Sequence, residues 1–180
     1  MCYLYCSHMK NHSSSQAMTL LEILIAVSIL GLLMALALPA VNKALQRRSN
    51  AITASRMRIA VNAFELYRSE NGGYPPDVNN GVTPPEMRPY FISLGIITLD
   101  DDGNVVGNWW EDDTDVGGEW DWDNGYHYAY SVSLCRPTAS QEQLEELDAL
   151  LEPPNSTDAG NLSTGRFRKY STQYHYILEE

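Results

Sequence analysis

The feature that most constrains this chain is an uncharged apolar stretch near its amino terminus. Every residue from 23 to 41 is apolar or small except Ser28. These 19 residues would form about 28 Å of α-helix, which is just enough to cross the hydrocarbon core of a bilayer. The stretch is longer than the core of a secretory signal peptide and is followed by the basic residues Lys43 and Arg47. We therefore expect a membrane-spanning helix, with signal-peptide cleavage around residues 35–37 as the alternative.

Charge and composition argue against several classes of protein. The 180 residues contain 12 Lys and Arg against 23 Asp and Glu, which gives a formal net charge of -11. Contacts with phosphates need clustered basic residues, so we expect no nucleic-acid partner. The three cysteines and four histidines lack the spacing of a zinc site, and no phosphate loop or nucleophile elbow is present. We expect no enzymatic activity, and the sequence assigns no role to Cys135.

Two residues of the apolar helix are unusual for a membrane span. Glu22 lies at its start, where a carboxylate in hydrocarbon is costly unless it is paired. It is therefore either an interfacial residue or a functional one. Pro39 lies near the far end, where it removes a backbone donor and weakens the helix locally.

Residues 17–22, Ala-Met-Thr-Leu-Leu-Glu, together with the apolar stretch and Pro39, resemble the amino-terminal signature of type IV prepilins and type II secretion pseudopilins. In that family a prepilin peptidase cuts before the apolar stretch and methylates the new amino terminus. The resemblance implies cleavage between Ala17 and Met18 and N-methylation of Met18. It also implies that Glu22 and Pro39 serve filament assembly.

The resemblance also sets the expected domains. We expect a prepilin leader over residues 1–17, shorter if Met9 is the true start, and a membrane and filament-core helix over residues 18–43. Residues 44–180 would form a periplasmic pilin-like domain. The basic residues after the span would favour the opposite orientation under the positive-inside rule. We follow the motif, because a dedicated peptidase reads it, whereas charge bias sets orientation only statistically.

The helix is expected to continue beyond the membrane. No Gly or Pro interrupts residues 41–70, and Asn71-Gly72-Gly73 is a plausible helix stop. Helix 44–71 should be amphipathic and cover a sheet, with Phe64 and Tyr67 contributing. The expected stripe recurs at steps of four and three and consists of Val41, Leu45, Arg48, Ile52, Ser55, Ile59, Asn62 and Leu66.

Residues 72–180 predict variable loops and a small antiparallel sheet. Ser140 and Gln143 predict a capping box for a leucine-rich helix that ends before Pro153. The strands are expected at residues 96–99 and 104–106, which form a hairpin, at the tyrosine-rich residues 126–134, and at residues 174–178. The predicted fold class is α+β and pilin-like, with the long helix packed on the sheet. Residues 66–75 also resemble the helix-to-loop junction of major, G-type pseudopilins, in a divergent branch.

All four tryptophans lie among carboxylates in residues 109–123. Carboxylates are hard oxygen ligands that suit calcium, and the resemblance to major pseudopilins implies calcium in this region. The candidate ligands are Asp112, Asp113, Asp115, Asp121 and Asp123. A sugar-binding surface of tryptophans is an alternative. We favour a third arrangement, in which the tryptophans pack on the sheet beside a solvated acidic loop.

The resemblance implies a structural subunit of a type II secretion pseudopilus. Such a subunit sits in the bacterial inner membrane with one span and then joins a periplasmic filament that supports protein export. Its partners would be further copies, other pseudopilins, the prepilin peptidase and the inner-membrane assembly platform, and calcium is the one cofactor considered. The alternatives are a type IV pilus subunit and a membrane-anchored carbohydrate-binding module. The sequence identifies neither the exported cargo nor a major or minor role.

Overall fold

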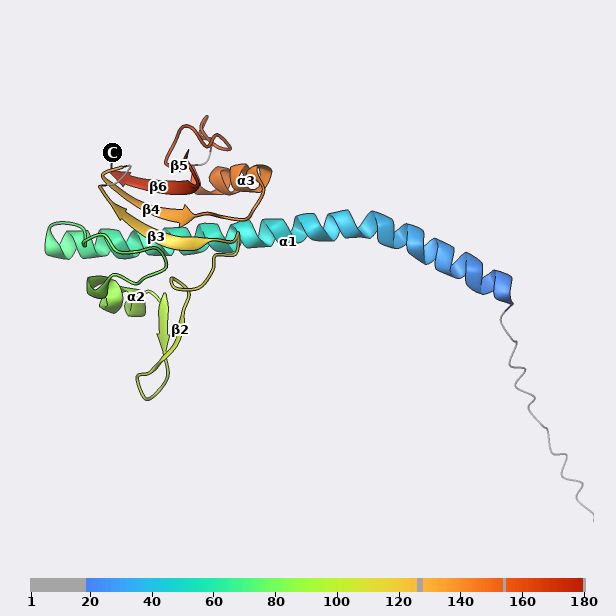
Figure 1. The fold of residues 1–180 in the computed structure, drawn as a ribbon, viewed down its shortest axis with the longest axis horizontal. Helices are drawn as coiled ribbons and strands as arrows, with labels where there is room; N and C mark the ends of the chain where they lie inside the picture. The colour runs from blue at the N-terminus through green and yellow to red at the C-terminus, as the bar shows by residue number, and fades with distance from the viewer. Residues whose placement is uncertain (1–18, 126–127, 154, 180) are drawn as a thin grey trace, which may run out of the picture. The chain divides into compact units, whose positions relative to one another are not determined.

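The computed structural model describes residues 19–125, 128–153 and 155–179. The chain divides into two compact units, Met1–Asn42 and Lys43–Glu180. The described part of the first unit is the apolar beginning of helix α1, which runs over Leu20–Asn71. The second unit holds the remainder of α1 and all the other elements, shown in Figure 1.

Helix α1 confirms the long helix predicted from the sequence. Its 52 residues continue through Pro39, which lacks the N–H that an interior helical residue normally donates. The helix ends at Asn71, and Gly72 follows with φ of 76°, a left-handed conformation that favours glycine. The Gly72 N–H donates to the Arg68 carbonyl at 2.8 Å. The predicted helix stop is therefore confirmed.

Two antiparallel sheets follow in the second unit. The larger has the order β3-β4-β6-β5 and the smaller is the hairpin β1-β2. The hairpin confirms the one predicted between residues 96 and 106. Its bounds are Ile97–Leu99 for β1 and Val105–Asn108 for β2; the four-stranded sheet consists of β3 (Glu119–Asn124), β4 (Tyr130–Cys135), β5 (Phe167–Tyr170) and β6 (Gln173–Glu179).

The predicted tyrosine-rich strand is shorter than expected. Strand β4 begins at Tyr130, Tyr128 lies in a bend, and Tyr126 falls outside the described residues. The physical reason is the turn between β3 and β4, which pair as neighbours. Gly125 has φ of 85° and donates its N–H to the Ala129 carbonyl at 2.9 Å, so a hydrogen bond between these two residues closes the turn.

Three short helical elements complete the unit. They are the 3₁₀ turn η1 (Pro85–Met87), α2 (Arg88–Ser93) and α3 (Gln141–Leu151). The Ser140 hydroxyl accepts a hydrogen bond from the Gln143 N–H at 3.2 Å, which confirms the predicted cap of α3. The Gln143 side chain does not close the capping box, because it donates to the Asn50 side chain on α1 instead, at 3.2 Å.

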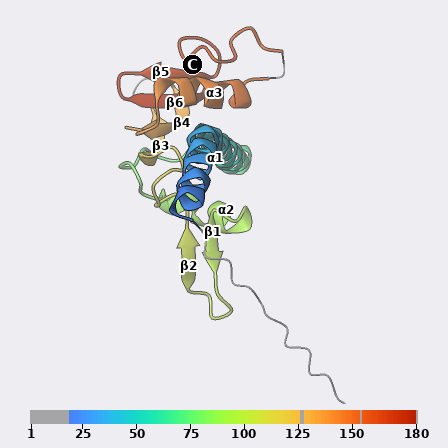
Figure 2. The same cartoon turned by 90° about the vertical axis from the view of Figure 1, so that its right-hand side faces the viewer.

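Within the second unit, helix α1 lies between two layers. Figures 1 and 2 show the four-stranded sheet and α3 on one side of it and α2 with the β1-β2 hairpin on the other. Phe64 joins these layers, since its ring stacks on Trp122 of β3 at 3.9 Å and contacts Phe91 of α2 at 5.9 Å and Trp110 at 5.7 Å between ring centroids. The predicted α+β architecture is confirmed.

The predicted stripe on α1 is wrong about which side of the helix is buried. Leu45, Arg48, Ser55, Asn62 and Leu66 are exposed. The buried residues form a neighbouring stripe that contains mostly small side chains: Asn50, Thr53, Ala54, Met57, Ala60, Ala63 and Phe64. The large aromatic side chains of the sheet and of α2 already fill the interior, so the helix must face them with small residues.

Candidate functional site

The beginning of α1 is organised by Thr19. Its hydroxyl and its carbonyl both accept from the Glu22 N–H, at 3.3 Å and 3.0 Å. Thr19 is therefore the N-cap, a role that the Thr-x-x-Glu spacing predicts but that our sequence analysis missed. The Glu22 side chain is exposed in the first turn of the helix, where a negative charge interacts favourably with the helix dipole.

The apolar part of α1 is exposed throughout. Its most apolar window has a mean hydropathy of 2.6 and no buried residue, so by length and composition the helix can cross a membrane. Its one hydroxyl, Ser28, donates to the Leu24 carbonyl at 2.7 Å and is therefore compatible with an apolar environment. Pro39 lies within the helix, as predicted. Ala17 and Met18, the predicted processing residues, lie outside the described part of the chain.

The five predicted calcium ligands are not brought together. Asp112 and Asp113 are exposed in the loop before β3, and Asp115 pairs with Arg56 at 2.8 Å. Asp121 and Asp123 lie on β3 and are 4% and 5% exposed. Among the residues that the structure describes, no group of three or more His, Cys, Asp or Glu side chains is arranged to hold a metal ion. The five residues as placed do not fit one calcium ion, and only Asp121 and Asp123 share a face.

The tryptophans belong to the core. Trp110, Trp120 and Trp122 are fully buried. The Trp110 ring stacks on Trp120, and Phe64 contacts the rings of both Trp110 and Trp122. Trp109 is half-buried, with the Arg56 guanidinium 5.4 Å above its ring. The predicted arrangement of tryptophans packed on the sheet is confirmed. The alternative sugar-binding surface is wrong, because buried rings offer no face on which a sugar can stack.

A buried polar network that was not predicted from the sequence lies on the other face of the sheet. Because the tryptophans of β3 point toward α1, the alternating Asp121 and Asp123 point away from it. Ser133 donates to Asp123 Oδ2 at 2.7 Å, and the Cys135 thiol donates to Asp121 Oδ2 at 3.3 Å. Burial, with a smaller contribution from Asp123, raises the pKa of Asp121 to about 7. Burial and the nearby Asp121 raise the pKa of the Cys135 thiol to about 12, so this thiol is protonated and poorly nucleophilic.

His175 of β6 joins the same network. Its Nδ1 lies 3.0 Å from Ser131 Oγ and 3.2 Å from Asp123 Oδ2. In a Ser-His-Asp catalytic triad the serine and the aspartate contact opposite nitrogens of the imidazole. Here both groups are on one nitrogen, so the arrangement holds the sheet together rather than activating Ser131. The sequence signal was the strict alternation of apolar and polar residues in Trp-Asp-Trp-Asp of β3 and Tyr-Ser-Val-Ser of β4.

The amino-terminal part of the chain matches a known protein-family model. Residues 12–38 match the family model described as the prokaryotic N-terminal methylation motif. No curated protein and no solved structure matches the chain. The matched residues include the start of α1, Glu22 and the first part of the exposed apolar helix. Prepilin-like proteins with this motif are in general structural proteins, which are processed by a prepilin peptidase and assembled into pilin-type filaments. The methylation motif, joined to a long helix and small antiparallel sheets, supports a type IV prepilin-like protein.

Proposed function

We propose that this chain is a structural subunit of a type II secretion pseudopilus that supports protein export. The single observation that carries the proposal is the methylation motif, which covers the start of α1 where the apolar part of the helix has no buried residue. Large apolar side chains from Leu20 to Val41 are between 49% and 84% exposed. A soluble monomer does not leave so large an apolar surface in water. In the proposal, the bilayer covers this surface first and neighbouring subunits cover it in the filament.

Processing is the first step of the proposed pathway. The prepilin peptidase cleaves between Ala17 and Met18 on the cytoplasmic side of the bacterial inner membrane and methylates the amino group of Met18. The domain from residue 44 onward lies in the periplasm, and the inner-membrane assembly platform draws the subunit into a filament with further copies and other pseudopilins. Because Pro39 lacks a backbone N–H, α1 has one helical hydrogen bond fewer there, which helps it adjust to filament packing.

Glu22 has the central role in this pathway. In the bilayer its carboxylate has no partner, whereas in a filament the amino group of a neighbouring Met18 can approach it. Two opposite charges attract much more strongly in a low-dielectric core than in water. The free-energy difference between the unpaired and paired carboxylate favours movement from the membrane into the filament.

The mass of the protein isolated from membranes tests the processing step. We expect a chain that begins at an N-methylated Met18 and retains the whole apolar helix. A chain that begins near Leu38 would show signal-peptide cleavage and contradict the proposal. A type IV pilus subunit is the second candidate, favoured equally by the methylation motif. Long surface fibres that contain this chain would favour the pilus, and short filaments confined to the periplasm would favour the pseudopilus.

Calcium enters the proposal only through Asp121 and Asp123. These carboxylates share one buried face, and Asp121 Oδ1 has no hydrogen-bond partner among the described residues. A cation bound only by the native state raises the melting temperature by mass action. Thermal unfolding of the full chain in detergent, with calcium or with magnesium, tests this site. A melting temperature that is unchanged in millimolar calcium removes calcium from the proposal.

A further inference from the structure

The β1-β2 hairpin is a surface without a partner. Residues 98–106 are all exposed, including Leu99 at 38%, Val105 at 44% and Val106 at 65%. The pairing register shifts between Thr98 and Leu99, so Val106 of β2 has no paired residue on β1 and forms a β-bulge. A β-bulge changes the direction in which side chains point. A two-stranded hairpin is marginally stable in water on its own, so contact with another chain would stabilise it.

The tip of this hairpin is rigid and acidic. The Asp100 carboxylate accepts hydrogen bonds from the N–H groups of Asp102 and Asn104, at 3.0 Å and 2.8 Å. Hydrogen bonds to its carboxylate lower the pKa of Asp100, and those from Asn104 contribute most. The side chains of Asp101 and Asp102 are left exposed, without a hydrogen bond or ion pair to any described residue. The hairpin therefore offers two free carboxylates beside two exposed valines.

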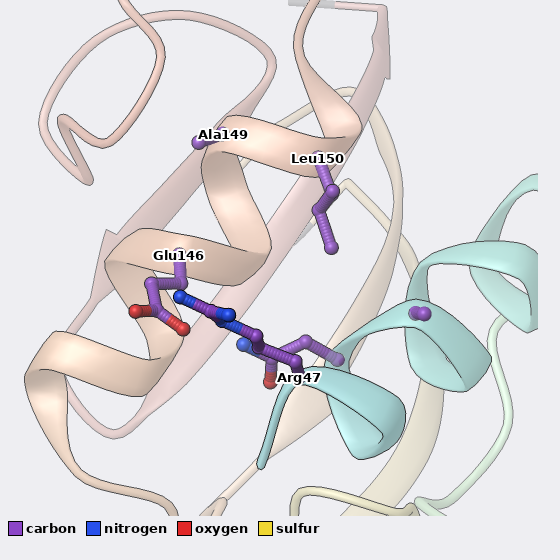
Figure 3. A pocket seen from close by; sticks show the side chains of 6 residues that line it. Arg47, Glu146, Ala149 and Leu150 are labelled. Atoms are coloured by element: carbon purple, nitrogen blue, oxygen red, sulfur yellow. The ribbon is translucent and has the colours of Figure 1, made fainter. Parts of the chain in front are cut away.

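A groove of complementary character lies on α1 and α3. It has a volume of about 370 Å³, and its apolar lining comes from Ala51, Ala149 and Leu150 (Figure 3). Figure 3 shows Arg47 of α1 extending toward Glu146 of α3, away from Leu150. The Arg47 side chain is exposed and makes no ion pair or hydrogen bond within the described part of the chain.

The residues that line the groove include one cation, Arg47, and one carboxylate, Glu146. Lys43 pairs with Glu146 at 3.7 Å, so the one carboxylate among the lining residues already has a counter-ion. The Arg58 guanidinium donates to the Leu150 carbonyl near the end of α3. Arg47 is therefore the cation that remains to be matched, next to an apolar surface.

We propose that the β1-β2 hairpin of one subunit docks into the α1-α3 groove of the next copy of this chain. Val105 and Val106 would cover the apolar lining, and Asp101 and Asp102 would pair with Arg47. The hairpin and the groove lie on opposite sides of α1 in one subunit, as Figures 1 and 2 show. A contact between two different surfaces is heterologous and can repeat without closing, which is the geometry of a helical filament. This inference rests on the proposed function and names the contact between neighbouring subunits.

Disulfide crosslinking in cells tests the contact. The full chain, with Cys2 and Cys6 replaced by Ser, carries Val106→Cys together with Leu150→Cys, and the control carries Val106→Cys with Leu66→Cys. Leu66 is 38% exposed and Leu150 is 43% exposed, so both positions are accessible to a second copy. We expect a ladder of linked dimers and higher species for the first pair and none for the control. Equal ladders for both pairs, or crosslinks only to a different protein, would overturn the inference.

Charge exchange tests the same contact without cysteines. We expect Arg47→Glu to lower the incorporation of subunits into filaments at least about tenfold, because like charges across a specific interface disfavour it. Asp101→Arg with Asp102→Arg should have a similar effect, and the three substitutions together should restore incorporation. Wild-type incorporation by the Arg47→Glu variant overturns the docking contact but leaves the proposed filament intact. Failure of the unaltered chain to enter any filament would instead contradict the proposed function.

Discussion

Asp148 on α3 should make the stability of the folded domain depend on pH. Its side chain is fully buried. Neither carboxylate oxygen makes a hydrogen bond of acceptable geometry with any described residue. Burial raises the pKa of Asp148 to about 6 from its ordinary value of 3.8, with smaller upward contributions from Glu152 and Asp158, and the backbone N–H groups of Gly160 and Asn161 oppose the rise. The neutral acid is therefore the form that the fold prefers.

The sign of the effect follows from proton binding. Below about pH 4 the carboxyl is protonated in both the folded and the unfolded chain, so burial costs nothing extra through ionisation. Between about pH 4 and 6 only the folded state holds the proton, so stability falls as the pH rises. Above about pH 6 the penalty is constant, and a shift of this size corresponds to about 3 kcal/mol at 1.4 kcal/mol for each pKa unit. Asp148→Asn removes the titration, at a pH-independent cost for burying the amide.

The assay is thermal unfolding of the full chain in detergent, followed by the fluorescence of the buried tryptophans. We expect the melting temperature of Asp148→Asn, relative to that of the unaltered chain, to rise by several degrees between pH 4 and 6 and then level off. The same substitution at the exposed Asp112 is the control and should give a flat difference. A flat difference for Asp148→Asn would refute the reasoning, because it would mean that the buried carboxylate does not resist ionisation.

Three further substitutions test other parts of the structure. Glu22→Ala should still be cleaved and inserted but should fail to assemble, because removing one member of a buried ion pair costs about 3 to 5 kcal/mol. Crosslinking between subunits in membranes measures assembly. Full-length filaments of this variant would show that Glu22 is an ordinary interfacial residue. Phe64→Ala should destabilise the domain by about 3 to 5 kcal/mol in thermal unfolding, because Phe64 is fully buried. The control Leu66→Ala should have a small effect. Equal losses of stability in the two variants would contradict the central place of Phe64 in the core. Arg56→Ala should cost about 1 kcal/mol through loss of the Asp115 pair and the Trp109 contact, and an unchanged melting temperature would show that both are immaterial.

The elements that local sequence patterns specify were predicted well. Helix α1, its end at Asn71, the β1-β2 hairpin and the cap of α3 all depend on residues that lie within a few positions of one another. The loss of the Gln143 part of the capping box shows the limit of such patterns. The side chain of Gln143 prefers Asn50, which is 93 residues away in the sequence, and no local rule contains that contact.

The buried side of α1 and the polar face of the sheet were not predicted, and for a related reason. A count of apolar side chains favoured Ile and Leu positions, whereas the interior needed Ala54, Ala60 and Ala63 opposite large aromatic rings. The polar face is closed by segments far apart in the sequence. The Tyr128 ring, for example, lies 5.4 Å from that of His175, in a bend that periodicity assigned to a strand. Both errors come from long-range packing.

The composition of α1 changes where its environment changes. From Leu20 to Val41 it carries large apolar side chains that no described part of the chain covers, and from Asn50 to Phe64 its buried side is made mainly of small residues. The second arrangement fixes the helix to its own domain, whereas the first leaves the helix surface available to whatever apolar surroundings are present. Lipid and neighbouring helices satisfy leucine and isoleucine about equally, so apolar contact alone gives no reason for the subunit to leave the membrane. Under the proposed function, the charge of Glu22 supplies the difference, because a partner of opposite charge exists in the filament and is absent in the lipid.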